Sequence, residues 1–257
     1  MNENVVVSAD WLAAHADEVR VVDVRDAWEY DGIGHVPGAV NVPFDAFRSE
    51  DGDEGMLPGE RRWADLLGEA GIERGDTVVA YDDTHGVFAA RFLVTAMLYG
   101  HEDLRLLDGD YSSWTRDHET TTDAPDVEPT TYEVVRPAET PLVDAEAVAA
   151  AVDSEAVLVD TRSVEEYEEE HIPGAVNLDW RDLVDEESRG LKPRAELEAT
   201  LEERGVTRDR RVVLYCNTAR RISHTYVVLR HLGYEDVDFY EGSLTQWLAE
   251  GREVESG

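Results

Sequence analysis

The chain has one cysteine, one lysine and no long hydrophobic run among its 257 residues. Because Cys216 is the only cysteine, an internal disulfide is excluded, and nothing in the composition indicates an oxidising compartment. No apolar run approaches the roughly 20 residues that a membrane-spanning helix needs. The first residues lack the basic stretch and apolar stretch of a secretory signal. We therefore expect a cytoplasmic protein without a membrane partner.

Basic residues are scarce: 23 Lys and Arg stand against 58 Asp and Glu, for a net charge of −35. The acidic residues are spread over the whole chain, so nucleic acids and anionic membranes would be repelled. Self-repulsion of this size destabilises a compact state unless salt screens it, and the screening length falls from about 10 Å at 0.1 M to about 3 Å at 1 M. With arginine almost the only basic residue, we interpret the chain as halophilic rather than simply acidic.

The sequence contains an internal repeat. "VVDVRDAWEYDGIGHVPGAVNV" from Val21 matches "LVDTRSVEEYEEEHIPGAVNL" from Leu158, and the block ending at Trp114 matches the block ending at Trp247. Long matched blocks indicate two copies of one domain. We predict domains at residues 1–120 and 142–257, joined by a linker at residues 121–141 that is rich in Thr, Pro and acidic residues.

Short apolar runs alternate with amphipathic segments in both copies. The runs Val78–Tyr81 and Val212–Tyr215 are typical of strands buried on both faces. Helix-like segments follow them at Phe88–Leu98 and Ile222–Leu232. This alternation predicts an α/β fold in which each domain is a parallel sheet flanked by helices.

Cys216 lies at the end of one predicted strand, in "VVLYCNTARRISH". Ligands of open parallel sheets bind beyond the carboxyl ends of the strands. A tight loop that enters a helix directs backbone N–H groups inward, which attracts anions and is expected to lower the pKa of a thiol. Arg220 and Arg221 add local positive charge. A buried packing thiol is the alternative, because free cysteine also packs as a small hydrophobe.

Taken together, the motifs resemble those of the tandem-domain rhodaneses, the thiosulfate and 3-mercaptopyruvate sulfurtransferases. The matching features are Asp-x-Arg at Asp23 and Asp160, both "H[VI]PGAVN" segments, "LLDGDYSSW", "FYEGSLTQW" and the cysteine in the second copy alone. The resemblance implies a silent first domain and a catalytic Cys216. In the first copy Asp82 follows the same strand and turn, and a carboxylate cannot accept sulfur as a nucleophile.

The resemblance implies a six-residue active loop, made of Cys216, Asn217, Thr218, Ala219, Arg220 and Arg221. Phosphatases that use cysteine need Cys-x5-Arg, whereas the arginine here stands at Cys-x4-Arg, which disfavours that alternative. Ala219 occupies a position that is often glycine, which limits a positive φ. Thr218 is uncharged, so the preference between thiosulfate and mercaptopyruvate stays open.

The resemblance also implies that Arg162 binds the donor, with a structural ion pair to Glu165 or Glu166 as the alternative. Asp23 and Asp160 are predicted to tie down the strand ends or orient the arginines. His35 and His171 occur in both copies, so we interpret them as scaffold. His224, on the helix after the loop, is expected to pack or lie at the surface.

We predict a sulfurtransferase that moves sulfur from a small anionic donor, thiosulfate or 3-mercaptopyruvate, to cyanide or a thiol through a Cys216 persulfide. Asn217 to Arg221 would stabilise the persulfide and, with Arg162, bind the donor. No cofactor is expected, and no His, Cys or acidic cluster has metal-ligand spacing. The alternative from another class is a non-enzymatic persulfide carrier or rhodanese-like binding module.

Overall fold

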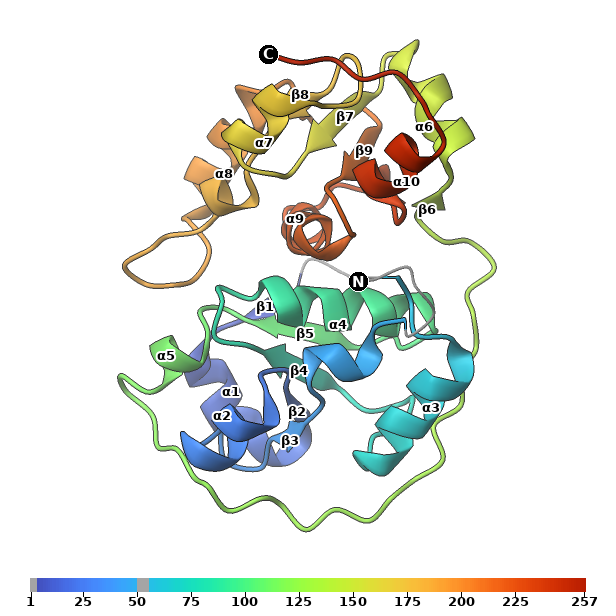
Figure 1. Cartoon of the computed structure of the whole chain (residues 1–257). Helices are drawn as coiled ribbons and strands as arrows, with labels where there is room; N and C mark the ends of the chain where they lie inside the picture. The colour runs from blue at the N-terminus through green and yellow to red at the C-terminus, as the bar shows by residue number, and fades with distance from the viewer. Residues whose placement is uncertain (1–3, 50–55) are drawn as a thin grey trace. The chain divides into compact units, whose positions relative to one another are not determined.

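The computed structural model describes residues 4–49 and 56–257. The chain divides into two compact units (Figure 1). Unit 1 comprises Glu3–Ala138 with Asp185–Leu191, and unit 2 comprises Glu139–Val184 with Lys192–Gly257. The predicted first domain begins at residue 1, and residues 1–3 and 50–55 lie outside the described part.

Unit 1 is built on a five-stranded sheet whose paired strands are all parallel, in the order β1-β5-β4-β2-β3. The strands are β1 (Val6–Val7), β2 (Arg20–Asp23), β3 (Val40–Asn41), β4 (Val78–Tyr81) and β5 (Leu104–Leu107). The helices are α1 (Ala9–His15), α2 (Ala27–Gly32), α3 (Glu60–Glu69), α4 (Val87–Leu98) and α5 (Tyr111–Trp114), with 3₁₀ turns η1 (Ala16–Glu18) and η2 (Phe44–Phe47).

Unit 2 repeats this topology, with all paired strands parallel in the order β6-β10-β9-β7-β8. Its strands are β6 (Leu142–Val143), β7 (Val157–Asp160), β8 (Val176–Asn177), β9 (Val212–Tyr215) and β10 (Val237–Tyr240). Its helices are α6 (Ala145–Val152), α7 (Val164–Glu169), α8 (Arg194–Glu202), α9 (Arg220–His231) and α10 (Ser243–Ala249), with the 3₁₀ turn η3 (Trp180–Leu183). The predicted α/β fold with two parallel sheets is therefore confirmed.

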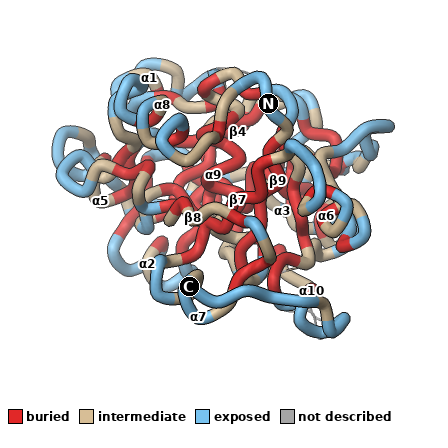
Figure 2. Tube along the Cα trace, turned by 90° about the horizontal axis from the view of Figure 1, so that it is seen from above, coloured by how far each residue is buried: buried red, intermediate tan, exposed pale blue. Residues whose placement is uncertain are grey.

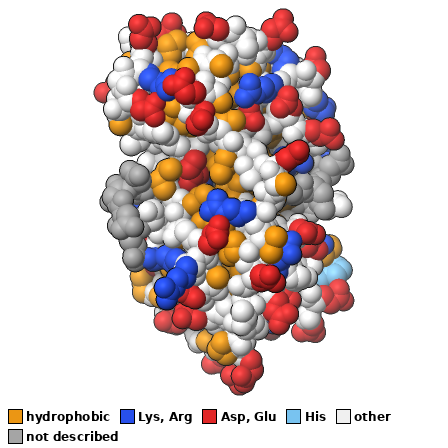
Figure 3. Space-filling view, turned by 90° about the vertical axis from the view of Figure 1, so that its right-hand side faces the viewer, with side chains coloured by type: hydrophobic (Ala, Val, Ile, Leu, Met, Phe, Trp, Pro, Cys, Tyr) orange, Lys and Arg blue, Asp and Glu red, His pale blue; other side chains and the backbone are white. Residues whose placement is uncertain are grey.

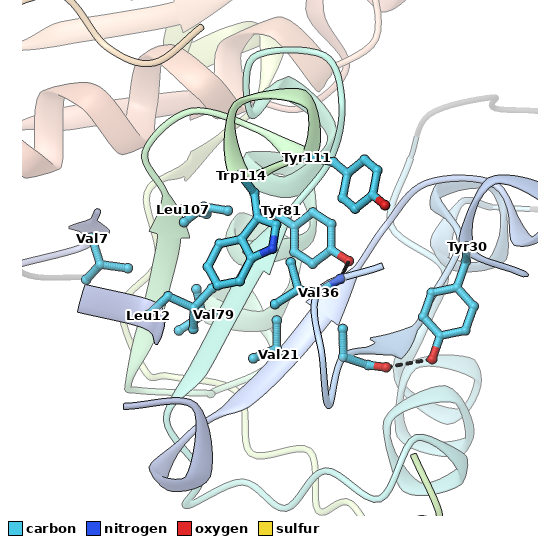
Figure 4. Close-up of a cluster of buried hydrophobic side chains, with 11 residues drawn as sticks. Val7, Leu12, Val21, Tyr30, Val36, Val79, Tyr81, Leu107, Tyr111 and Trp114 are labelled. Atoms are coloured by element: carbon cyan, nitrogen blue, oxygen red, sulfur yellow. Dashed lines mark hydrogen bonds between the residues drawn. The ribbon is translucent and has the colours of Figure 1, made fainter. Parts of the chain in front are cut away.

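The central strands are buried on both faces, which explains their uninterrupted apolar sequence. In β4 all four residues are buried, and the same holds for β9; Figure 2 shows this burial along the trace. Val79 and Tyr81 point into one cluster with Leu12 of α1, Tyr30 of α2 and Trp114 of α5, drawn in Figure 4. α4 packs against strands β4 and β5 of the sheet and also contacts η2. Each unit is thus a sheet between two helical layers.

A buried ion pair closes the carboxyl end of β2. Asp23 accepts the backbone N–H of Arg25 at 2.9 Å and both Nε and Nη2 of its guanidinium, with Nη2 at 2.6 Å. Arg25 Nη2 also donates to the carbonyl of Gly34. Tyr81 Oη donates to Asp23 at 2.6 Å. Burial is the main cause that raises the pKa of Tyr81 well above its ordinary value, and the Asp23 carboxylate raises it further. This is the orienting role predicted for the aspartate.

The segment predicted as a linker is packed against unit 1 over much of its length. Thr130 N donates to the carbonyl of Gly68 at 2.8 Å, and Val135 N donates to that of Tyr99 at 3.2 Å. Tyr132 is buried, and its hydroxyl lies 3.1 Å from Nδ1 of His101. These contacts place the segment up to Ala138 in unit 1, while the domain boundaries at 120 and 142 stay predictions.

On the face shown in Figure 3, acidic side chains are widely spread, and the basic ones lie singly or in small groups among them. Within the described residues, no helix combines the length and the hydrophobicity that crossing a membrane requires.

We predict that Asp23→Asn destabilises the protein by about 3–5 kcal/mol, because it leaves the buried Arg25 guanidinium without its counter-charge. Urea unfolding followed by circular dichroism measures the loss. Asp45→Asn is the matched control, because Asp45 pairs with Arg48 from a side chain that is 78% exposed; it should cost at most about 1 kcal/mol. Equal losses in the two variants would contradict the prediction.

Candidate active site

Cys216 lies directly after β9 and before the first turn of α9. Its side chain is inside the fold, with 1% of the residue exposed. Its backbone N–H donates to Ser243 Oγ at 3.1 Å, and its carbonyl accepts from Leu244 N at 2.9 Å. The same anchor exists in unit 1, where Tyr111 N donates to the carbonyl of Asp82 at 2.8 Å. The start of the last helix of each unit, α10 in unit 2 and α5 in unit 1, therefore fixes this strand end.

Ala219 caps α9 in the left-handed conformation, with φ 65° and ψ −5°. In unit 1 the residue that caps α4 is Gly86, with φ 82° and ψ 5°. The expected limit on positive φ is therefore exceeded: the loop requires this conformation, and alanine adopts it. A left-handed non-glycine residue costs roughly 1–2 kcal/mol, so Ala219 carries strain that Gly86 avoids at the corresponding helix cap.

The loop of unit 1 holds a carboxyl group in a ring of backbone N–H groups. Asp82 Oδ1 accepts from Thr84 at 2.7 Å and Gly86 at 2.8 Å. Its Oδ2 accepts from Phe88 at 2.7 Å and Ala89 at 3.0 Å. Burial raises the pKa of this carboxyl, and the four N–H donors oppose that shift. The strand-to-helix loop of unit 1 is thus shaped to receive an acceptor such as a carboxylate.

The two loops differ in length, which corrects the expectation that Asp82 follows the same turn as Cys216. Residues 82–86 join β4 to α4, whereas only residues 216–219 join β9 to α9. The longer loop of unit 1 contains His85 at φ 54°, in addition to Gly86. The strand ends match, but the turns do not.

Arg162 is held by Asp160, two residues earlier, and not by Glu165 or Glu166 as the alternative had it. Asp160 accepts from the Arg162 backbone N–H at 3.0 Å and from Nε and Nη2, with Nη2 at 2.7 Å. Nη2 also donates to the carbonyl of Glu170. Nη1 points to the loop, 3.5 Å from Asn217 Oδ1. The pair repeats Asp23–Arg25, so most of this guanidinium serves the scaffold.

Glu166 connects two of the predicted loop residues. Its Oε1 accepts from Asn217 Nδ2 at 2.9 Å and from Arg221 Nη2 at 2.8 Å, while Oε2 accepts from Arg221 Nη1. The structure therefore links Arg162 directly, and Arg221 through Glu166, to Asn217, the residue that follows Cys216. Thr218 is exposed, and Arg220 is half-buried beside it.

A family model described as the rhodanese-like domain matches residues 8–117 and 144–250. The putative thiosulfate sulfurtransferase SseA of Mycobacterium bovis is 37% identical, over 94% of this chain and 87% of that protein. The sulfur carrier protein TtuD of Thermus thermophilus is 33% identical, over 95% and 93%. The solved structure of SseA from Escherichia coli, a 3-mercaptopyruvate sulfurtransferase, covers 93% of this chain and 98% of that one with a TM-score of 0.84 and 27% identity.

The chain belongs to the rhodanese family. The predicted resemblance to tandem rhodaneses, and with it the class of rhodanese-type sulfurtransferase, is confirmed at the level of the family. The repeat seen in the sequence corresponds to the two matched rhodanese domains.

Two residues that shape this rhodanese site were not predicted in that role: Glu166 was considered only as an ion-pair partner of Arg162, and Ser243 was not singled out. Ser243 is fully buried at φ 49°, and its hydroxyl donates to the carbonyl of Tyr240 at 2.9 Å while accepting from Cys216 N. Thr245 Oγ1 donates to the carbonyl of Asn217 at 2.8 Å. The quoted "EGSLTQW" contains both hydroxyl residues, and the signal was its contrast with "DGDYSSW", where Asp110 stands in place of Ser243.

The histidines of the repeat belong to the scaffold, as predicted. His35 stacks on Tyr30 with ring centroids 3.7 Å apart, and His171 stacks on Tyr167 at 3.8 Å. His224 is buried and packs edge-on against Trp180 in the unit 2 core. Across residues 4–49 and 56–257, no group of three His, Cys, Asp or Glu side chains is arranged to hold a metal ion.

We predict that Ala219→Gly stabilises the protein by up to about 1 kcal/mol. Relief of the left-handed strain, roughly 1–2 kcal/mol, exceeds the about 0.4–1 kcal/mol that glycine costs through the freer unfolded chain. Urea unfolding measures the change. Ala199→Gly, on an exposed position within α8, should instead lose about 1 kcal/mol. A loss of the same size in both variants would refute the strain.

We also predict a pH-dependent contribution from Glu166. The hydrogen bond from Arg221, opposed by partial burial, lowers the pKa of this carboxyl from 4.5 to about 2. A carboxyl whose pKa is lower in the folded than in the unfolded protein stabilises the fold at pH values above its unfolded-state pKa. That stabilisation is lost as the pH falls and the carboxyl is protonated. The difference in unfolding free energy between wild type and Glu166→Gln should therefore be constant above pH 4.5 and shrink as the pH falls toward 2. A difference that stays constant down to pH 2 would exclude this linkage.

Proposed function

We propose that this chain transfers a sulfane sulfur from thiosulfate to cyanide or a thiol through a persulfide on Cys216. The observation that carries the proposal is the pair of loops. In unit 1 the loop closes on a carboxyl with four N–H groups, and in unit 2 the corresponding strand end bears the thiol. Backbone N–H groups at such a strand-to-helix connection would stabilise the persulfide anion formed on Cys216.

The reaction has two half-steps. The Cys216 thiolate attacks the outer sulfur of thiosulfate, a new S–S bond forms, and the bond to the sulfonate sulfur breaks. Sulfite leaves with the electron pair. The carbon of cyanide, or the sulfur of an acceptor thiolate, then attacks the outer sulfur of the persulfide. Thiocyanate or a new persulfide departs, and the Cys216 thiolate returns. No external oxidant or reductant is needed.

The donor would be bound by its anionic end. Backbone N–H groups of residues 217–221 would stabilise the sulfur anion, and Arg162, Arg220 and Arg221 would supply positive charge. Nη1 of Arg162 supports this role, because it faces Asn217 of the loop and not Asp160. Since Cys216 is the only cysteine, the sulfur must pass to another molecule.

3-Mercaptopyruvate is the second candidate donor. Thr218 is exposed at the loop and carries no charge, so the loop offers a neutral hydroxyl at that point. A donor with a carboxylate and a polarisable carbonyl suits such a group. The 27% identical SseA structure is of a 3-mercaptopyruvate sulfurtransferase, which supports the same choice.

A sulfur carrier is the candidate from another class, and TtuD of Thermus thermophilus favours it at 33% identity. In that case Cys216 would accept sulfur and transfer it to a partner protein without turnover on small acceptors.

We further propose that the protein is cytoplasmic and works at high salt, which the net charge of −35 and the single cysteine support.

Cyanide and the two donors test the proposal directly. Purified protein at high salt is incubated with thiosulfate or 3-mercaptopyruvate and then with cyanide, and thiocyanate is measured. We expect wild type to form thiocyanate and Cys216→Ser to form none. Asp82→Asn alters the same strand end in the silent unit, so the folded variant should keep the activity.

The outcomes separate the three candidates. If neither donor gives thiocyanate, the proposal of an enzyme is contradicted. If only 3-mercaptopyruvate gives thiocyanate, that compound and not thiosulfate is the donor. One added sulfur on Cys216 by mass spectrometry, without turnover, would establish the carrier. Equal activity in Cys216→Ser would exclude Cys216 as the nucleophile.

A further inference from the structure

The charge of Arg221 is balanced by a carboxylate within the candidate site. Glu166 accepts both terminal nitrogens of the guanidinium in a two-pronged pair. The two side chains are 18% and 33% exposed, so the contact is partly shielded from solvent. With its pKa lowered to about 2, chiefly by this hydrogen bond, Glu166 keeps its charge at any physiological pH.

Glu166 is fixed in this position by the start of α7. Its Oε2 also accepts from Ser163 N at 3.2 Å, and Ser163 Oγ accepts from Glu166 N at 3.3 Å. This is a reciprocal cap of the helix. Asn217 Nδ2 adds a donor from the loop. The carboxylate therefore cannot turn to solvent without uncapping α7.

Arg221 interacts electrostatically with the thiol. Burial lowers the pKa of Arg221, but the hydrogen bond to Glu166 and the electrostatic interactions with Cys216 and Glu166 outweigh it, so that the pKa is raised. Arg221 is therefore a positive charge that an anionic donor at Cys216 would meet. Because Glu166 is in contact with the same guanidinium, it weakens the attraction that a second negative charge on the donor would feel.

The silent unit separates the two roles of this glutamate. Glu29 caps α2 through the same reciprocal arrangement with Asp26. After the silent loop come Val87 and Phe88, which carry no charge. Helix capping is therefore a role that Glu29 and Glu166 share. The contact with Arg221 is an additional feature of Glu166, in the unit that bears the thiol.

We propose that Glu166 is a positioning residue that sets donor preference through Arg221, disfavouring dianionic thiosulfate relative to donors whose anionic end is a single carboxylate. The repulsion between a fixed carboxylate and a donor grows with the donor's charge, so the dianion is penalised more. This inference rests on the proposed function, because it concerns the donor of that same site.

Glu166→Gln tests the inference, because glutamine keeps the size and a capping oxygen but removes the charge. We expect KM for thiosulfate to fall roughly tenfold, with a much smaller change for 3-mercaptopyruvate and with kcat changing less than KM. Glu166→Asp, which retains the charge, should keep the wild-type donor ratio. Urea unfolding of each variant establishes that it is folded.

Two matched controls remove one negative charge elsewhere. Glu165→Gln changes the exposed neighbour in α7, and Glu29→Gln changes the equivalent cap in unit 1. Neither should alter the donor ratio by more than about twofold. A change in Glu165→Gln equal to that in Glu166→Gln would show that general charge, and not the contact with Arg221, sets the preference.

A double-mutant cycle locates the effect. In the Arg221→Met background, Glu166→Gln should no longer shift the donor ratio, since the residue acts through the guanidinium. The shift should also shrink when KCl is raised several-fold from the lowest concentration in which the protein stays folded, because salt screens the longer-range attraction. A shift that persists in the Arg221→Met background or is independent of salt would overturn the proposal.

Binding measurements keep this inference distinct from the proposed function. In Cys216→Ser protein, which cannot turn over, thiosulfate should bind roughly tenfold more tightly after Glu166→Gln by isothermal titration, and pyruvate should change little. If wild type forms no thiocyanate, the proposed function fails and this titration still decides the role of Glu166. If wild type is active and neither the donor ratio nor the titration changes, the role of Glu166 is refuted alone.

Discussion

A buried aspartate that holds the arginine two residues later is the interaction on which the rest of each unit depends. Asp160 closes β7, fixes the Arg162 backbone and guanidinium, and helps to raise the pKa of Tyr215 at the end of β9, where burial is the larger cause. Tyr215 Oη in turn accepts from Ile172 N. Since a buried pair of this kind is costly to break from one side, the strand ends that carry the site are held rigidly.

The fold followed from the sequence because its signals are local or repeated. Two all-apolar runs before helix-like segments indicated central parallel strands, and β4 and β9 have those bounds. The site was only partly predictable. Cys216 and its loop are contiguous, whereas Glu166 and Ser243 reach the loop from distant segments, and no pattern in one sequence reveals which side chains converge. The donor role of Arg162 came from the family resemblance and stays a prediction, while the structure adds that Asp160 holds its Nε and Nη2.

The two units show how one scaffold serves a carboxyl-bearing and a thiol-bearing loop. Both keep the aspartate–arginine pair, the stacked tyrosine and histidine, and the glutamate cap. They differ where the loop meets the next helix. The loop of unit 1 fills its own centre with Asp82, while the other presents Cys216 with an arginine that a carboxylate holds in place. Shared contacts therefore maintain the fold, and unshared contacts define the chemistry.

The extra residue between β4 and α4 limits what a single substitution can do in unit 1. Five residues, 82–86, join strand to helix there, whereas four residues, 216–219, make the same connection in unit 2. Replacing Asp82 by cysteine would therefore place a thiol at the matching strand end but in a turn of another length. Building a second thiol loop like that of unit 2 would require a deletion as well as a substitution, so the two halves of the repeat are not interchangeable by point mutation.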